Sequence, residues 1–441
     1  MAIYVVRSRV LSGRLSRHAL LALAAAAACT AGALAGAPTL VPYSFTPLGF
    51  LSGGFVSQAA GVSPNGQIVV GSSGSFAGNE AFAWRPGTGM VIVWPVPVGN
   101  ESSAFAVTDT GIIAGAQGLS GAERASRSPR APFSIAGSAS EATDLSADGE
   151  TFVGRINGTL AFTSAPFYFN SAAGLVNLPL GTAAQGAATS TNNTAQFTAG
   201  WRSGTNNSIR TPALWERTSS TPLAFTATTL PISALASSAE ANCVSGDGSV
   251  IVGTENSPSG TRGVRWTRPN GGGSIIAVNL PSLGGFGSSA LAVSADASVT
   301  VGVAQRTNGG SAAAFWRFGQ TVDLQALLGT LVPTGWNVDA ITDVSANGTV
   351  VVGFARDNAN RIQAYRATIT RPCGRSDIAS PGQLGRPDGE LTADDIILFI
   401  NRFSNRDARG DIAGPGQSLG ADGEFTADDI IVFINAFTVA C

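Results

Sequence analysis

The side chains in this chain best suited to chemistry are acids that occur twice, in the same order, near the C-terminus. The two copies lie 34 residues apart. An Asp-Gly pair followed by an acid at the twelfth loop position is half of an EF-hand, in which glycine makes the sharp turn and oxygens surround calcium. The candidate calcium ligands are Asp377, Asp388, Glu390 and Asp395 in the first copy, and Asp411, Asp422, Glu424 and Asp429 in the second.

The first half of each loop departs from that pattern. When Asp-Gly is placed at positions five and six, Asp395 and Asp429 fall at position 12, but no carboxylate stands at positions one or three. An enlarged loop would have to bring back Asp377 and Asp411, which lie 11 residues before the Asp-Gly pairs. The alternative is that these acids only cap helices.

Other kinds of chemistry are excluded by composition. The chain has no lysine, its 26 basic residues are all arginine, and its one histidine is His18. Residues 1–35 predict an export signal, with four arginines, an alanine-rich run and a small-residue cleavage pattern. After cleavage, no histidine base, histidine-ligated zinc, Schiff-base lysine or lysine-bearing phosphate loop is possible. No later stretch reaches 18 apolar residues, so no membrane span is expected in the mature chain.

Carboxylates outside the tail leave one catalytic alternative open. A polysaccharide hydrolase would need two carboxyl groups about 5 to 9 Å apart, and the candidates are Glu80, Glu101, Asp144, Glu216 and Asp343. Residues 36–372 carry 17 acids and 17 arginines, whereas residues 373–441 carry 11 acids and five arginines. A neutral body without a basic stripe excludes nucleic acid as a partner.

The body, residues 36–372, is a repeat array. Val62-Ser63-Pro64-Asn65-Gly66 followed by Ile68-Val69-Val70-Gly71 recurs, and the closing glycines are Gly71, Gly115, Gly154, Gly200, Gly253, Gly302 and Gly353. Seven units of about 48 residues result.

Each unit predicts short strands joined by tight turns. Asn-Gly or Asp-Gly is typical of a two-residue hairpin turn, and the β-branched run after it is a buried strand. A second apolar signal predicts an aromatic strand in each unit, at 81–84, 132–133, 166–168, 213–215, 263–266, 314–316 and 364–365. About four strands in 40 to 50 residues are the dimensions of a propeller blade. We therefore predict a mainly β fold, a seven-bladed β-propeller, with its tryptophans in the blade cores.

The tail, residues 373–441, predicts two amphipathic helices. Thr392 and Thr426 are N-cap candidates, with acids in the first helical turn where the helix dipole favours them. Ile396, Phe399, Ile400 and Phe403 share one face, as do Ile430, Phe433, Ile434 and Phe437. Two such helices can pack against each other.

The repeated Val-Ser-x-Asp-Gly-x-x-Val-Val-Gly followed by Ala-Phe-x-Trp resembles the HAF repeat of secreted bacterial proteins. The resemblance covers nearly the whole body. It implies a propeller-like fold and export, and it brings no established reaction or ligand.

The tail resembles dockerin modules, in particular the divergent type with Gly-Pro-Gly-Gln loops, Thr-Ala-Asp-Asp-Ile-Ile helices and a terminal cysteine. The resemblance implies calcium-dependent folding and docking onto a cohesin-like or cell-envelope protein. In an exported protein, a disulfide between Cys373 and Cys441 is expected, because it would close the two ends of the module. Cys243 is left unpaired, and we expect a buried thiol there.

The sequence thus predicts a secreted or cell-surface protein whose propeller binds or scaffolds, with polysaccharide as a possible ligand, and whose small α-helical tail tethers it. The alternative is a carboxylate-dependent polysaccharide hydrolase on the same tether. A third possibility is that the tail is a sorting signal.

Overall fold

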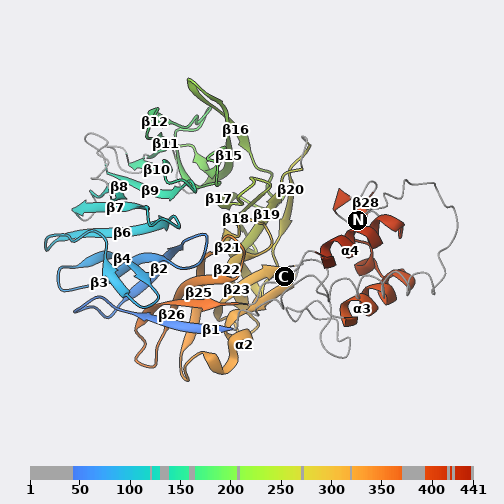
Figure 1. Cartoon of the computed structure of the whole chain (residues 1–441). Coiled ribbons are helices and arrows are strands. Elements are labelled where there is room, and N and C mark those ends of the chain that lie inside the picture. Colours follow the sequence, from blue (N-terminus) through green and yellow to red (C-terminus); the bar gives the residue numbers. More distant parts are fainter. Residues whose placement is uncertain are drawn as a thin grey trace, which may run out of the picture. The chain divides into compact units, whose positions relative to one another are not determined.

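The computed structural model describes residues 43–119, 122–129, 139–157, 164–205, 209–269, 273–317, 320–369, 393–414, 418–419 and 423–438. Strands dominate, and most of them form seven sheets arranged in a ring (Figure 1). The predicted seven-bladed β-propeller is confirmed. It forms one compact unit, Val41–Ile369, against the predicted range of 36–372, and helices α3 and α4 belong to a second unit. The predicted export signal lies outside the described residues.

Each blade is an antiparallel sheet, with its first strand innermost. Blade 1 contains β2 (Ser57–Val62), β3 (Val69–Gly74), β4 (Asn79–Arg85) and β5 (Gly89–Ile92). Blade 2 contains β6 (Asn100–Val107), β7 (Ile113–Leu119) and β8 (Arg124–Ser128). Blade 3 contains β9 (Ser140–Leu145), β10 (Thr151–Asn157), β11 (Ser164–Asn170) and β12 (Gly174–Asn177). Blade 4 contains β13 (Gln185–Thr191), β14 (Phe197–Ser203), β15 (Arg210–Ser220) and β16 (Leu223–Thr229). Blade 5 contains β17 (Ser238–Val244), β18 (Val250–Ser257), β19 (Gly260–Thr267) and β20 (Ile276–Asn279).

Blades 6 and 7 complete the ring, and the first strand of the chain closes it. Blade 6 has β21 (Gly284–Val293), β22 (Thr300–Arg306), β23 (Ser311–Arg317) and β24 (Gln320–Asp323). Blade 7 has β25 (Asn337–Val344), β26 (Val350–Arg356) and β27 (Ile362–Thr368), and β1 (Ser44–Gly49) is its outer strand. β1 pairs with β27 from Ser44 opposite Thr368. The N-terminal strand therefore holds the last blade against the first.

The predicted aromatic strand of blade 2, at 132–133, lies outside the described residues. The third described strand of this blade, β8, is Arg-Ala-Ser-Arg-Ser and has no aromatic residue. In five of the other blades a predicted aromatic on the third strand is fully buried: Phe82, Phe167, Trp215, Trp266 and Phe315. Tyr365 fills the same place in blade 7. None of the seven tryptophans is exposed, in agreement with their predicted place in the blade cores.

The turn that follows each innermost strand is longer than predicted. In blade 1 the Ser63 and Ile68 backbones pair, which leaves four residues between them, and only Gly66 has a positive φ, of 74°. The Asn65 side chain accepts hydrogen bonds from the Ser63 hydroxyl and the Gln67 amide. The two-residue hairpin turn is therefore wrong, because Asn65 acts through its side chain and does not adopt a left-handed backbone.

The closing glycine of each repeat is required by a close approach between strands. A Cβ on Gly253 would lie 2.0 Å from the Glu240 carbonyl oxygen and 2.9 Å from the Trp266 ring. The closing glycines of the other six blades meet an inner-strand carbonyl oxygen at 1.9 to 2.1 Å in the same way. The repeated glycine thus admits both the inner strand and, in blades 4 and 5, the indole of the third strand.

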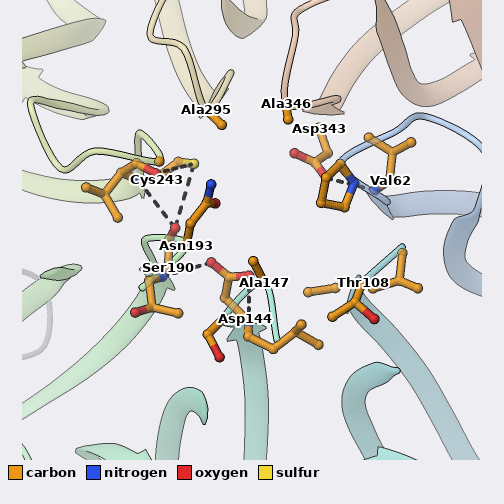
Figure 2. A pocket seen from close by; sticks show the side chains of 18 of the residues that line it. Val62, Thr108, Asp144, Ala147, Ser190, Asn193, Cys243, Ala295, Asp343 and Ala346 are labelled. Atoms are coloured by element: carbon orange, nitrogen blue, oxygen red, sulfur yellow. Dashed lines mark hydrogen bonds between the residues drawn. The ribbon is translucent and has the colours of Figure 1, made fainter. Parts of the chain in front are cut away.

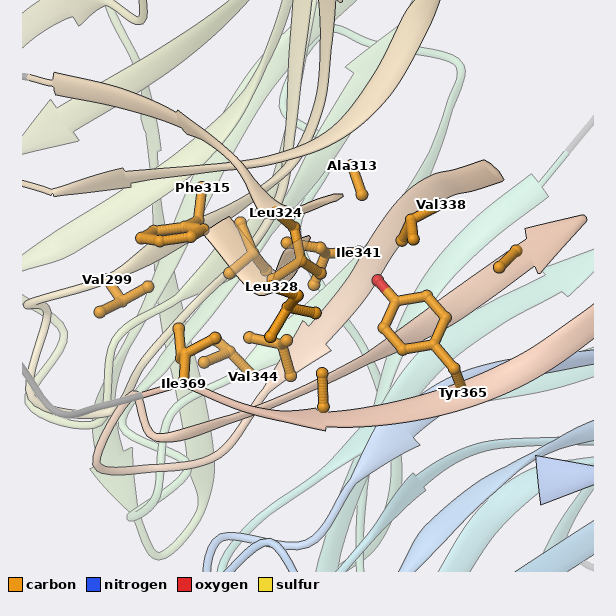
Figure 3. Close-up of a cluster of buried hydrophobic side chains, with 14 of the residues drawn as sticks. Val299, Ala313, Phe315, Leu324, Leu328, Val338, Ile341, Val344, Tyr365 and Ile369 are labelled. Atoms are coloured by element: carbon orange, nitrogen blue, oxygen red, sulfur yellow. The ribbon is translucent and has the colours of Figure 1, made fainter. Parts of the chain in front are cut away.

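Apolar side chains from neighbouring blades form the core. The largest cluster fills the space between blades 6 and 7 and includes Phe315, Ile341 and Tyr365 (Figure 3). The short helix α2 (Leu324–Leu328) continues into a 3₁₀ turn, η1 (Gly329–Leu331), and contributes Leu324 and Leu328 to this cluster. α2 begins after Asp323, whose carboxylate accepts from two backbone amides at the helix start. The connection between the two blades is thereby part of the core.

The C-terminal unit contains two helices, as predicted: α3 (Ala393–Ser404) and α4 (Ala427–Thr438). Between them lie a 3₁₀ turn, η3 (Ala408–Gly410), and the short strands β28 (Ala413–Gly414) and β29 (Ser418–Leu419). The Phe399 and Phe433 rings stack with centroids 4.0 Å apart. The predicted packing of the two apolar faces is confirmed for these residues.

Candidate functional site

A cavity of about 120 Å³ lies at one mouth of the propeller's central channel, and every blade contributes to its wall (Figure 2). Its lining comes from the last residues of the seven innermost strands and from the turns that follow them. An aliphatic residue from six of the blades lines it: Val62, Val107, Leu145, Val244, Val293 and Val344. Blade 4 supplies Thr191 instead, and the exposed Ala147 and Asn193 stand at the rim.

A bulge in each innermost strand determines which side chains face this cavity. In blade 7, Ile341 pairs with Gly353 and Asp343 with Val352, so Thr342 is the extra residue. The residue after the extra one is, in the seven blades in order, Gly61, Ala106, Asp144, Ser190, Cys243, Ala292 and Asp343. All of these except Gly61 and Ala292 line the cavity. Bulges commonly redirect side chains in this way.

The two aspartates at this position make the same contacts. Asp144 Oδ1 accepts from the Leu145 amide and its Oδ2 from the Thr191 amide of the next blade, each at 2.8 Å. Asp343 accepts in the same way from Val344 and from Val62, each at 2.8 Å. Each carboxylate therefore joins two neighbouring blades.

The extra residue of the bulge strengthens the same junctions. Thr342 Oγ1 donates to the Val352 carbonyl of its own blade and, at 2.9 Å, to the Ala59 carbonyl of blade 1. Thr143 and Thr189 make the equivalent pairs of contacts in blades 3 and 4. A Thr-Asp pair immediately before the repeated Leu/Val-Ser is the sequence signal of such a junction.

The cavity is acidic and holds no basic side chain. Burial raises the pKa of Asp343 from 3.8 to about 7, and the charge of Asp144 adds to this effect, although two backbone amides act against it. Burial also raises the pKa of Asp144 to about 6. Both aspartates are half-buried, and they line a cavity whose wall comes from all seven blades. No arginine is among the lining residues.

Cys243 is the unpaired cysteine that the sequence left over. It is half-buried and lines the cavity, with its Sγ 3.7 Å from the Ser190 hydroxyl. Burial and the charge of Asp144 raise the pKa of the thiol to about 12. The thiol is therefore protonated at neutral pH and a poor nucleophile.

Only two of the five carboxylates that the sequence offered for catalysis meet in the cavity. Glu80 is buried on β4, where it accepts from the Val96 amide. Glu101 lies at the start of β6 and Glu216 on β15, and neither lines the cavity. Asp144 and Asp343 were two of the five predicted candidates, but nothing in the sequence indicates that they lie together.

In the tail, the second acidic copy forms a compact loop. Asp429 is fully buried, and its two oxygens accept from the Thr426 amide at 2.9 Å and the Ile412 amide at 2.7 Å. Asp411 Oδ2 accepts from the Gly423 amide at 2.7 Å. The longer loop thus brings Asp411 back to the Asp-Gly turn.

These contacts also explain how α4 begins. The Thr426 hydroxyl accepts from the Asp428 amide, so Thr426 is the predicted N-cap. With Asp429 bonded back to the Thr426 amide, the pair forms a capping box. In the first copy Asp395 is fully buried, and in the second Glu424 is exposed. Asp377, Asp388, Glu390, Asp422, Cys373 and Cys441 lie outside the described residues.

Calcium takes six to eight oxygen ligands, and of the predicted ones the structure shows hydrogen-bond partners for Asp411 and Asp429, whose oxygens accept backbone amides. Within the described ranges, no three acidic, cysteine or histidine side chains are grouped closely enough to hold a metal ion. In the same part of the chain, no helix combines the length and the apolar character needed to cross a membrane.

Comparisons with known proteins show similarity of fold only. No family profile and no curated protein matches the chain. An oligogalacturonate lyase from Vibrio parahaemolyticus has 11% identity and a TM-score of 0.48 over 75% of this chain and 98% of its own. A structure of oligogalacturonate lyase in complex with manganese has 10% identity and a TM-score of 0.46, over 75% and 97%. TolB from Acinetobacter baumannii has 12% identity and a TM-score of 0.35, over 71% of this chain and only 63% of that one.

Proposed function

We propose that this chain is an exported, non-catalytic binding and scaffolding protein, in which the propeller binds an extracellular ligand such as a polysaccharide and the tail tethers it to a partner. The size of the channel cavity carries the first half of the proposal. At about 120 Å³ it is well below the roughly 300 to 1,000 Å³ of ordinary ligand clefts. We infer from this size that the two carboxyls that meet there do not act on a glycan chain.

The hydrogen bonds of these carboxyls support the same conclusion. Both oxygens of Asp144 and of Asp343 accept backbone amides from two blades, so the side chains are fixed as part of the ring. A glycosidase carboxylate must instead reach the glycosidic oxygen or the anomeric carbon. A propeller fold alone does not imply an activity.

The test incubates the full chain with cell-wall polysaccharides and measures released reducing ends and bound protein in the same samples. We expect binding without release. Release that disappears in the double variant Asp144→Asn/Asp343→Asn would show the hydrolase alternative to be correct.

For the tail, we propose a calcium-dependent tether in the manner of a dockerin module. The support is the second loop, in which the Ile412 amide, next to Asp411, donates to Asp429, and the Gly423 amide donates to Asp411. The remaining ligands would be the other acids of the two copies and backbone carbonyls. Bound calcium would supply a charge that offsets the acids and fixes the loop that leads into α4.

Calcium titration of the full chain tests this proposal. We expect Asp411→Asn and Asp429→Asn to weaken calcium binding at least tenfold. Asp407→Asn is the control, because it removes the same charge from an exposed ion pair with Arg409 in the same unit. Wild-type affinity in the two loop variants would mean that these acids are helix caps only. If calcium binds as expected, the full chain can serve as bait, and a cell-envelope protein that is captured with calcium and elutes with chelator would be the partner.

A further inference from the structure

We propose that the channel mouth is a binding site for a small alkylammonium group. Its charge lies between Asp144 and Asp343, and its carbon chain lies against the apolar side chains of the cavity wall. This site is separate from the proposed polysaccharide and tail interactions. It rests on the cavity that all seven blades build and on the two chemically distinct parts of its wall.

The first part of the wall is the pair of carboxylates. They stand on blades 3 and 7 and face the same space, as Figure 2 shows, and the charge of one acts on the other. Each oxygen accepts one backbone amide, the Ser190 hydroxyl adds a hydrogen bond to Asp144, and both Asp343 oxygens keep a second lone pair. No basic side chain is among the described lining residues, so the cation that balances these two charges must be a bound ligand.

Arginines near this face are engaged elsewhere. Arg366 donates to the Gly66 carbonyl, and Arg268 to the Gly248 carbonyl, both in the turns around the mouth. Arg265 donates to the Ala297 carbonyl in the same way. These guanidinium groups support the turns and do not line the cavity.

The second part of the wall selects the kind of cation. Five of the six aliphatic side chains named above are packed in the cores between the blades, and the half-buried Pro64, Ala295 and Ala346 complete the apolar surface at the mouth. This surface would gain nothing from a hydrated metal ion. The apolar side chains would favour the carbon chain of an amine, since its apolar surface leaves water on binding. The volume of about 120 Å³ suits a group of four or five carbon atoms, because a cavity of about 150 Å³ holds benzene.

The test uses the full chain and ligand-observed NMR titrations with n-butylamine, n-butanol and calcium. At pH 8.5 both carboxyls are ionised and the amine is still charged, so we expect butylamine to bind at least tenfold more tightly than butanol. At pH 5 both carboxyls are protonated, and binding of the amine should fall at least tenfold. The only other titratable group in the lining is Cys243, which stays neutral throughout this range.

Variants separate the site from general surface charge. Asp144→Asn and Asp343→Asn should each weaken butylamine binding at least tenfold. Asp247→Asn is the matched control, since it removes a carboxylate from a turn at the same face where two other blades carry asparagine. Equal binding of amine and alcohol, equal binding at both pH values, or binding of calcium but not of amine would each overturn the proposal. The wild-type pH comparison decides the matter even where an asparagine variant folds poorly.

Discussion

Two groups of aspartates lie within a few residues of each other on the same face of the propeller, and their environments are opposite. Asp247 belongs to the repeated turn, where the hydroxyls of Ser245 and Ser249 and a backbone amide bond its carboxylate and lower its pKa despite some burial. Asp343 belongs to the bulge, where burial raises the pKa to about 7. The acid of the repeated turn stabilises that turn, whereas the acid that only blades 3 and 7 carry makes the cavity acidic.

The same contrast appears between blades. At the bulge, blades 3 and 7 carry Asp144 and Asp343, whereas blade 1 carries Gly61. A Cβ on Gly61 would lie 2.3 Å from the Phe105 carbonyl oxygen of the next blade, so no acid fits there. The residue at the bulge therefore depends on how closely the next blade approaches, and an acid occupies this position only in blades 3 and 7.

The strongest way to test the structural half of this comparison is to change a repeated glycine. Gly253→Ala should destabilise the propeller by about 3 kcal/mol, because the new Cβ overlaps the Glu240 carbonyl oxygen and presses on Trp266. Chemical denaturation would measure the loss. Gly204→Ala is the control, since its Cβ meets nothing within 4 Å, and we expect a change of no more than about 0.5 kcal/mol there. Equal effects in the two variants would contradict the role of the closing glycine.

The second prediction concerns pH and the unrepeated acids. Because the folded-state pKa of Asp343 is above its unfolded value, its contribution to stability is fully present below about pH 4 and is lost as pH rises through about 7. Asp343→Asn should therefore reduce the fall in unfolding free energy between pH 5 and pH 8.5 by about 2 kcal/mol. Asp144→Asn should act in the same direction but less, since its pKa is about 6.

Asp247→Asn gives the opposite sign and serves as the control. Its pKa is lowered in the folded state, so its contribution is present above the unfolded value near 4 and is lost as pH falls through the folded pKa. Between pH 5 and pH 8.5 the slope should match that of the wild type. Denaturant titrations across this range would show the difference, and parallel slopes in the Asp343 and Asp247 variants would remove the distinction between the two groups.

Much of the propeller could be predicted because the repeat records local requirements. The Ser-x-Asx-Gly turn, the buried strand after it and the glycine at its end each depend on neighbours in the same sheet, so they recur wherever a blade occurs. In the tail, the Thr426 cap and the Phe399 and Phe433 contact follow from helix periodicity in the same way. Local rules were sufficient for these features.

The closure and the cavity depend on distant residues and could not be predicted. β1 carries no repeat phrase, and its place beside β27 follows from the need to close the ring. Asp144 and Asp343 are 199 positions apart in the sequence and meet only because bulges in two separate blades turn them to one axis. The sequence showed both acids but not the geometry that joins them.

The smallest expected effect lies in the degenerate turns, where alanine stands in place of glycine. Ala297 has φ of 61° and Ala195 has φ of 53°, a backbone region that costs an L-residue about 1 kcal/mol or more. Ala297→Gly should therefore stabilise the propeller by about 0.5 kcal/mol after allowing for the greater freedom of glycine when unfolded. In Ala195→Gly this gain should be cancelled, because the methyl group of Ala195 is buried, with 2% exposed, and its loss costs about 0.8 kcal/mol. Thermal unfolding of the two variants side by side would measure the difference. A gain in neither variant would show that the degenerate turns tolerate alanine without strain, and that the repeated glycine of the turn, unlike the closing glycine, is exchangeable.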